Sequence, residues 1–282
     1  MVEVTLLGVA QDGGRPQAGC TRPCCAGLSA DQASFPVALG ITDGAANHLV
    51  EATRFLGQQL SIWGQTKIDN VLLTHAHFGH VDGLGLFGKE TMNARGVGLH
   101  ISSEMEHLVD RTPQWSLMVD QGVFSPHTFH DGDALHLSEN VTVQPIRVPH
   151  RDELSDMHAF IIRGPNRSLM FLPDHDTWQE TLARHHQPTI RSWLASLEVD
   201  IALIDGTFWS GDELAGRNQD KVPHPPVSQT LDMLGPRTEN DPEVHFIHLN
   251  HTNPLYDSNS EATAALNASG WSIAVQGQTF SL

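Results

Sequence analysis

Three histidines stand close together in the segment THAHFGHVDGL, at positions 75, 77 and 80. They follow the apolar run NVLL, which predicts a buried strand that ends at this motif. Because alternate residues of a strand face the same side, we expect His75 and His77 to point at one ion, while His80 approaches from another direction. Neutral imidazoles bind zinc, iron, copper or nickel, so the spacing predicts a metal centre without naming its metal.

At this motif the chain resembles the metallo-β-lactamase superfamily, whose signature is H-x-H-x-D-H. Gly79 stands where the family has an aspartate, which normally helps to bind a second metal. The resemblance therefore implies a first site and leaves open whether the second site is filled. Asp82 is near, but it lies beyond His80 and is not expected to be a ligand.

Further segments match the family in the same order, so the resemblance covers nearly the whole chain. It implies that His150, in VPHRDELSDMHAF, is the third ligand of the first site. Asp174, in MFLPDHDTW, is placed like the family's bridging carboxylate, and the resemblance implies that it both binds metal and takes part in catalysis. His248, in VHFIHLNHTNP, matches the final histidine and would serve the second metal together with His80. The implied fold is an α+β, four-layer αββα sandwich with the site at the rim where two sheets meet.

A narrower resemblance is to the branch that contains the B protein of pyrroloquinoline quinone biosynthesis; the segments that carry it are GVAQDGGRPQAGC, PHRDELSD, LPDHDTW and HLNHTNP. Members often hold a structural zinc with cysteines after the first strand. Here Arg22 takes the place of the middle cysteine, and the implied ligands are Cys20, Cys24, Cys25 and His251. The alternative is three reduced thiols packed in a loop.

Five other residues are weighed near these motifs. His224, in KVPHPPVSQTL, stands where relatives place an active-site histidine before a helix, and we interpret it as a proton donor to a leaving group. The alternative is a structural residue held between prolines. Asp205 is interpreted as a strand-end turn residue, with a carboxylate that supports a metal ligand from behind as the alternative. Phe208 and Trp209 are candidate walls of a substrate pocket. His158 is interpreted as a surface residue of a strand, with a place in the pocket lining as the alternative.

The pattern of elements predicts a single domain over residues 1–282, in which helices intervene between strands. Strands are expected over 2–9, 69–75, 97–102, 199–207, 244–251 and 271–276, a β region broken at SEN over about 133–149, and strand pairs over 36–52 and 158–174. Helices are expected over 54–64, 81–96, 177–197 (interrupted at Pro188) and 261–269. This order favours two sheets covered by outer helices.

Composition limits the classes of partner. The chain has 16 basic and 33 acidic residues, for a net charge of −17, which argues against binding nucleic acid. It has no run of 18 apolar residues, so we expect no membrane span. The start lacks the features of a secretory signal, so we expect a cytoplasmic protein, although a signal peptide that has already been removed remains an alternative. We expect the partner to be a small-molecule substrate. The sequence leaves the oligomeric state open, with a homodimer among the possibilities.

Three functions remain open on the sequence. The leading one is a metal-dependent hydrolase, in which zinc or another ion activates water on an ester, lactone or phosphodiester. The runner-up is an iron-dependent oxidoreductase or oxygenase related to pyrroloquinoline quinone biosynthesis, because histidine-rich sites hold iron well. The third is a non-catalytic metal-binding protein.

Overall fold

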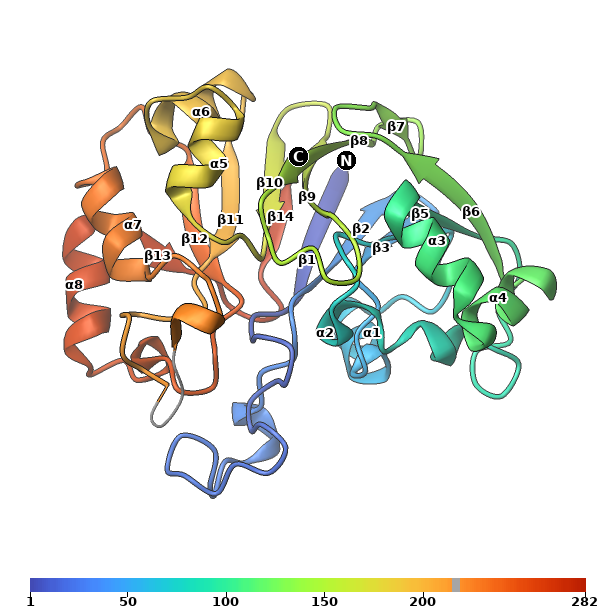
Figure 1. The fold of residues 1–282 in the computed structure, drawn as a ribbon, viewed down its shortest axis with the longest axis horizontal. Coiled ribbons are helices and arrows are strands. Elements are labelled where there is room, and N and C mark those ends of the chain that lie inside the picture. Colours follow the sequence, from blue (N-terminus) through green and yellow to red (C-terminus); the bar gives the residue numbers. More distant parts are fainter. Residues whose placement is uncertain (215–218) are drawn as a thin grey trace.

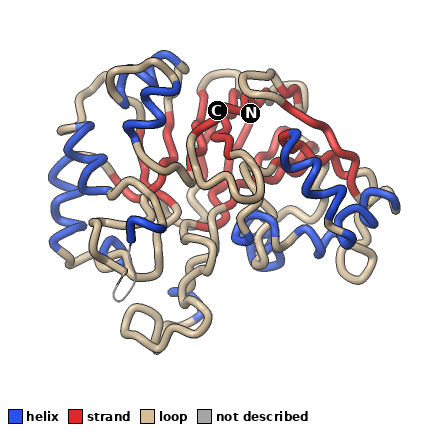
Figure 2. The backbone as a smooth tube through the Cα atoms, in the orientation of Figure 1, coloured by secondary structure: helices blue, strands red, loops and turns tan. Residues whose placement is uncertain are grey.

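The computed structural model describes residues 1–214 and 219–282. Two seven-stranded sheets lie at the centre of the molecule, and helices cover the outer side of each (Figures 1 and 2). This arrangement confirms the expected α+β, four-layer sandwich. Within the described residues, no helix is long and apolar enough to cross a membrane.

The first sheet has the strand order β14-β1-β2-β3-β4-β5-β6. Its strands are β1 Val2–Gly8, β2 Ala38–Asp43, β3 Ala46–Val50, β4 Asn70–Leu72, β5 Val97–Ser102, β6 Phe124–Phe129 and β14 Thr279–Ser281. β2 and β3 form the predicted hairpin, and Gly44 in its turn has a positive φ of 61°, which suits glycine. From β3 to β6 the strands run parallel.

The second sheet has the order β13-β12-β11-β10-β9-β8-β7. Its strands are β7 Leu135–His136, β8 Thr142–Val148, β9 Met157–Arg163, β10 Ser168–Leu172, β11 Ile201–Asp205, β12 Glu243–Ile247 and β13 Ser272–Ile273. β9 and β10 pair antiparallel as predicted, and β10, β11 and β12 run parallel. β10 and β11 are buried along their whole length, which explains their continuous apolar sequences.

The helices are short and many begin at a capping side chain. They are α1 Leu56–Trp63, α2 Phe78–Val81, α3 Ser103–Arg111, α4 Pro113–Asp120, α5 Trp178–Arg184, α6 Ile190–Ser196, α7 Val227–Leu234 and α8 Glu261–Ser269, with 3₁₀ turns η1 Ala30–Gln32, η2 Leu84–Phe87, η3 Gln219–Lys221 and η4 Pro254–Tyr256. Ser102, Thr177, Thr189 and Ser260 each accept a hydrogen bond from a backbone N–H of the first turn. Such caps satisfy donors that the helix itself leaves free.

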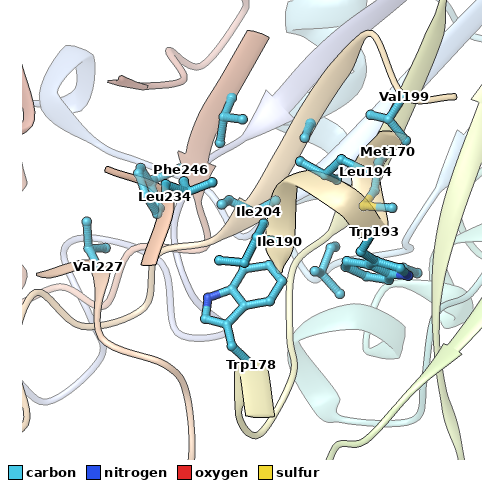
Figure 3. Packing of buried hydrophobic residues seen from close by; sticks show 14 of the residues in the cluster. Met170, Trp178, Ile190, Trp193, Leu194, Val199, Ile204, Val227, Leu234 and Phe246 are labelled. Carbon is cyan, nitrogen blue, oxygen red and sulfur yellow. The ribbon is translucent and has the colours of Figure 1, made fainter. Parts of the chain in front are cut away.

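Three apolar cores correspond to the three interfaces between layers. One lies between the sheets and includes Phe160 and Phe171, and a second lies between the first sheet and its helices. In the third, Trp178 and Trp193 pack from α5 and α6 onto Met170 and Ile204 of the second sheet (Figure 3). Burying these side chains is the main stabilising contribution to the sandwich.

Several predicted elements are corrected by the structure. β4 ends at Leu72, so the histidine motif lies in a loop and in α2, not at the end of the strand. The helix expected over 81–96 is only the 3₁₀ turn η2 and irregular turns, because its four glycines weaken helix formation. The sequence did not predict α3, α4 or β6, and the chain closes with β14 in the first sheet, not with β13.

The strand directions determine where functional residues gather. β8, β10, β11 and β12 all run in one direction in the second sheet, and β1 and β4 share a direction in the first. Strands that run in the same direction bring their carboxyl ends to one edge of the sheet. The loops that follow these six strands therefore meet along one rim, which is where the polar residues of the motifs lie.

Candidate metal centre

The first group of ligand atoms at the rim comes from His75, His77 and His150. Nε2 of His75 lies 2.8 Å from Nδ1 of His77, and Nε2 of His150 lies 3.3 Å from the same atom. These three side chains converge closely enough to hold one metal ion, and we call them the first subsite.

The second group includes a residue that the sequence analysis did not single out. Nε2 of His80 lies 3.2 Å, and Nε2 of His248 3.5 Å, from Oδ1 of Asp12. Asp12, His80 and His248 form the second subsite, again close enough for one ion. Asp12 stands in the segment GVAQDGGRPQAGC, which carries the narrower resemblance, but nothing there identified it as a ligand, because this glycine-rich loop lies far in sequence from the histidine motif.

Asp174 lies between the two subsites. Its Oδ2 is 3.3 Å from Nε2 of His80, and its Oδ1 is 3.5 Å from Nε2 of His248 and 3.7 Å from Nε2 of His150. One carboxylate thus faces ligands of both subsites, which is the geometry of a bridging group. The structure brings together all six residues expected at the active site.

Partners behind the first subsite set which ring nitrogens face inward. Nδ1 of His150 lies 3.1 Å from Asp176, and Nδ1 of His75 lies 2.9 Å from the Thr74 hydroxyl, which itself donates to Glu51. Each Nδ1–H therefore donates outward, and the unprotonated Nε2 faces the subsite. Partners of this kind fix the tautomer of metal-binding histidines.

The second subsite has the same design. Nδ1 of His80 faces Oε1 of Glu51 at 3.1 Å. Nδ1 of His248 lies 2.8 Å from the hydroxyl of Thr207, which donates to Asp205 at 2.7 Å. The outer nitrogen of His80 faces a buried carboxylate directly, and that of His248 faces one through the Thr207 hydroxyl, which leaves Nε2 of both available inside.

The inward atoms are buried and lack partners of their own. Nε2 of His80, Nε2 of His248, Oδ1 of Asp12 and Oδ2 of Asp174 have no hydrogen bond within the described residues. Buried polar groups are normally satisfied, so such a convergence requires an explanation. A divalent cation held by Asp12, His80 and His248 would satisfy the three inward atoms of these residues, and nitrogen and oxygen donors of this kind fit zinc or iron.

The carboxylates of the rim remain ionised. Burial raises the pKa of Asp174, but the neighbouring His248 and His80 outweigh it and hold the pKa well below its usual range. The pKa of Asp12 is likewise raised by burial and lowered more strongly by His248 and His80. The carboxylates of Asp12 and Asp174 both lie near Nε2 of His80 and of His248, and their negative charges favour the binding of a cation there.

Two residues of this region have strained backbones. Glu51 and His248 have positive φ values of 69° and 61°, a region that side-chain-bearing residues rarely adopt. Each such residue costs roughly 1–3 kcal/mol, and strain of this kind is concentrated at functional sites. The surrounding packing therefore holds both side chains in place at the expense of local stability.

His224 lies beside the rim and pairs with Asp205. Its Nδ1 is 2.7 Å from Oδ2 of Asp205, and both side chains are buried. Burial lowers the pKa of His224, but the Asp205 carboxylate more than reverses this and the net pKa is raised. Asp205 is thus more than the expected turn residue: it also accepts from the Thr207 backbone and orients His224.

A pocket of about 270 Å³ opens next to His224. Its lining within the described residues is Asp176, Thr177, Gly211, Gln219, Val222, Pro223, His224, Pro225, Pro226 and Gln229. Phe208 and Trp209, the expected walls, are not among them; Phe208 is fully buried and packs edge-on against the His224 ring at 5.9 Å.

His158 was expected at the surface of a strand, but it is buried on β9 against Phe129.

The cysteines gather at a second place, in the loop between β1 and β2. Sγ of Cys20 and Cys24 are 3.8 Å apart, and Nδ1 of His251 lies 3.5 Å from Sγ of Cys24 and 3.3 Å from Sγ of Cys25. We call these four residues the thiolate cluster. All four ligand atoms are close enough for one ion, and both adjacent cysteines take part. Three sulfur atoms and one imidazole are typical of a structural zinc site.

The sandwich and its rim of histidines and carboxylates define a metallo-β-lactamase fold. The family model described as "Beta-lactamase superfamily domain" matches residues 42–248, and the chain belongs to this family. Its two clusters have ligand sets suited to metal binding.

Among curated proteins, the chain is similar over its full length to coenzyme PQQ synthesis protein B. It is 27% identical to the protein of Xanthomonas campestris pv. campestris (strain B100) and 24% identical to that of Acinetobacter baumannii (strain ACICU), with 100% of each chain covered.

Solved structures show the same fold. Zn(2+)-bound PqqB from Methylobacterium extorquens has a TM-score of 0.77 at 22% identity, covering 99% of this chain and 100% of that one. A diphosphatase from the PhnP family has a TM-score of 0.71 at 19% identity, covering 100% and 98%.

Proposed function

We propose that this protein is a metal-dependent hydrolase of a small ester, lactone or phosphodiester-type molecule. The observation that carries the proposal is the convergence of unpartnered, buried ligand atoms from His80, His248, Asp12 and Asp174 beside the first subsite. Metal ions held by the two subsites would lower the pKa of water and polarise the bond to be cleaved.

The protein's own groups complete this chemistry. Asp174 faces ligands of both subsites. His224, held in one tautomer by Asp205, is the candidate proton donor to the leaving group, since its raised pKa favours the protonated form. The adjacent pocket offers room for a small organic group, and no lysine or arginine lines its described part, which favours an uncharged substrate portion there.

His224→Gln tests this assignment. With metal-loaded protein and a panel of aryl esters, lactones and phosphodiesters, we expect kcat to fall about 10²–10⁴-fold while metal content is unchanged. His245→Gln is the matched control, because His245 lies on β12 near His248 but makes its hydrogen bond with Ser272, away from the rim. Hydrolysis that is equally fast in both variants, or absent from the wild-type protein across the panel, would contradict the proposal.

A second candidate is an iron-dependent oxidoreductase. The rim contains only nitrogen and oxygen ligands, which suit iron(II), and the full-length relatives are named for coenzyme PQQ synthesis. Oxygen consumption that needs iron-loaded protein and is lost on zinc loading would favour this candidate over the hydrolase. Hydrolysis with zinc and no oxygen consumption with iron would exclude it.

A further inference from the structure

The second subsite lacks the carboxylate that its sequence motif would normally supply. Gly79 occupies that position, in the first turn of α2 between His77 and His80. A β-carbon added at Gly79 would lie 2.5 Å from both Cα and Cγ of Asp12, which is closer than real β-carbons approach other atoms. The space that a side chain at position 79 needs is therefore already filled by Asp12.

Asp12 places a carboxylate where the motif residue would have placed one. Its Oδ1 lies 3.2 Å from Nε2 of His80 and 3.5 Å from Nε2 of His248, and this atom is buried without a hydrogen-bond partner. It thus faces the same two histidines as Asp174 does from the other side.

The loop that carries Asp12 is held firmly against the second sheet. Gln11 N–H donates to the carbonyl of Leu249 at 2.9 Å, and Leu249 N–H donates to the carbonyl of Val9 at 2.8 Å. Leu249 directly follows His248, so the backbone of one ligand is paired with that of the other. This pairing fixes Asp12 more rigidly than an exposed loop position would suggest.

We infer that Asp12 and Gly79 form an exchanged pair, in which Asp12 is the carboxylate ligand of the second metal and Gly79 is small because it makes room for it. The inference rests on the proposed function only in requiring a second ion at the rim. A second ion is therefore expected although the motif aspartate is missing.

Asp12→Asn is the first test, with Asp82→Asn as the matched control. Asp82 is an acidic residue of the same motif, but it pairs with Arg54 and lies outside both subsites. In titrations with manganese(II), read by elemental analysis and by the spin coupling of neighbouring ions, the wild type and the control should bind two ions at the rim. Asp12→Asn should weaken the binding of the second manganese ion about 10–100-fold and abolish the spin coupling between the two ions.

Gly79→Ala is the sharper test, because it removes no ligand atom. If Gly79 were an ordinary helix residue, alanine would leave metal binding unchanged and would not destabilise α2. An exchanged pair instead requires Gly79→Ala to displace Asp12 and weaken the second ion as Asp12→Asn does, with the first ion retained.

Two results would overturn the inference: a wild-type rim that binds a single ion, or unchanged binding of the second ion in both variants. Two coupled ions in a wild-type protein that hydrolyses nothing would count against the proposed function and leave this inference intact.

Discussion

The rim of the two sheets and the loop between β1 and β2 each gather metal-binding side chains, but they differ in ligand chemistry and in access. The rim site, which comprises the first and second subsites and Asp174, uses only imidazoles and carboxylates and lies near a pocket. The thiolate cluster uses three sulfurs and one imidazole, a set that leaves no ligand position for substrate. One region is suited to chemistry and the other to holding the chain.

The two regions are also connected. The segment between β1 and β2, drawn in blue, extends below the sheets in Figure 1 and carries both Asp12 and the cysteines. His251 of the thiolate cluster lies three residues after His248 of the rim. Zinc at the thiolate cluster would therefore fasten the segment that delivers Asp12.

The largest effect is expected from Asp174→Asn, because this residue faces both subsites. The amide removes the negative charge from among the buried histidines, so the rim should lose its metal and hydrolysis should fall more than about 10³-fold. Elemental analysis should find that zinc at the thiolate cluster remains. Loss of metal from both regions together would break the distinction between them.

Cys25→Ser should affect stability first and the rim second. Cys25 is buried, and its Sγ accepts from Gln17 N–H at 3.3 Å. Without this thiolate the zinc should be lost, with a fall in unfolding free energy of several kcal/mol, measured by denaturant titration. The first subsite should keep its ion while the second binds about 10-fold more weakly, since Asp12 is less firmly held. A rim with unchanged affinity for both ions would show that the regions are independent.

Asp205→Asn should lower activity without removing metal. The amide cannot accept from His224 as the carboxylate does, so His224 is no longer held in one tautomer. We expect kcat to fall about 10²-fold, with metal content near that of the wild type in elemental analysis. A fall in metal content as large as the fall in kcat would assign Asp205 to metal binding through Thr207 and His248.

Asp241→Asn should leave both regions unaffected. Arg191 donates to Asp241 and lowers the pKa of this carboxyl from its usual 3.8 to about 2. The pair therefore makes its full contribution to the stability of the fold at pH values above 3.8, the usual pKa of the carboxyl. This contribution is lost as the pH falls through about 2, the pKa in the folded protein. Because Arg191 is partly exposed, the variant should lose only about 1 kcal/mol at neutral pH, measured by urea unfolding, and this difference should vanish in strong acid.

Local patterns predicted most of the strands correctly. Apolar runs such as VDIALIDGT and SLMFLPD belong to strands buried along their whole length, where burial dominates the choice of residue. The helices were harder to predict. The segment 81–96 has helical spacing but too many glycines, and α3 and α4, whose sequences contain many polar residues, were not predicted. The loop position of His75 and His77 also differs from the prediction, since β4 ends three residues before His75.

The sequence by itself determined which residue types stand after the strands. The apolar runs predict buried strands, and the metal-binding side chains follow these runs in the chain: His75, His77, His80, His150, Asp174 and His248. Only the tertiary structure decided which other groups join them. Asp12 reaches the second subsite from the loop that follows β1, and Glu51 and Asp205 orient His80 and His224 from behind. Such contacts depend on the order and direction of the strands, because these alone bring the ends of β1, β4 and β12 to one rim.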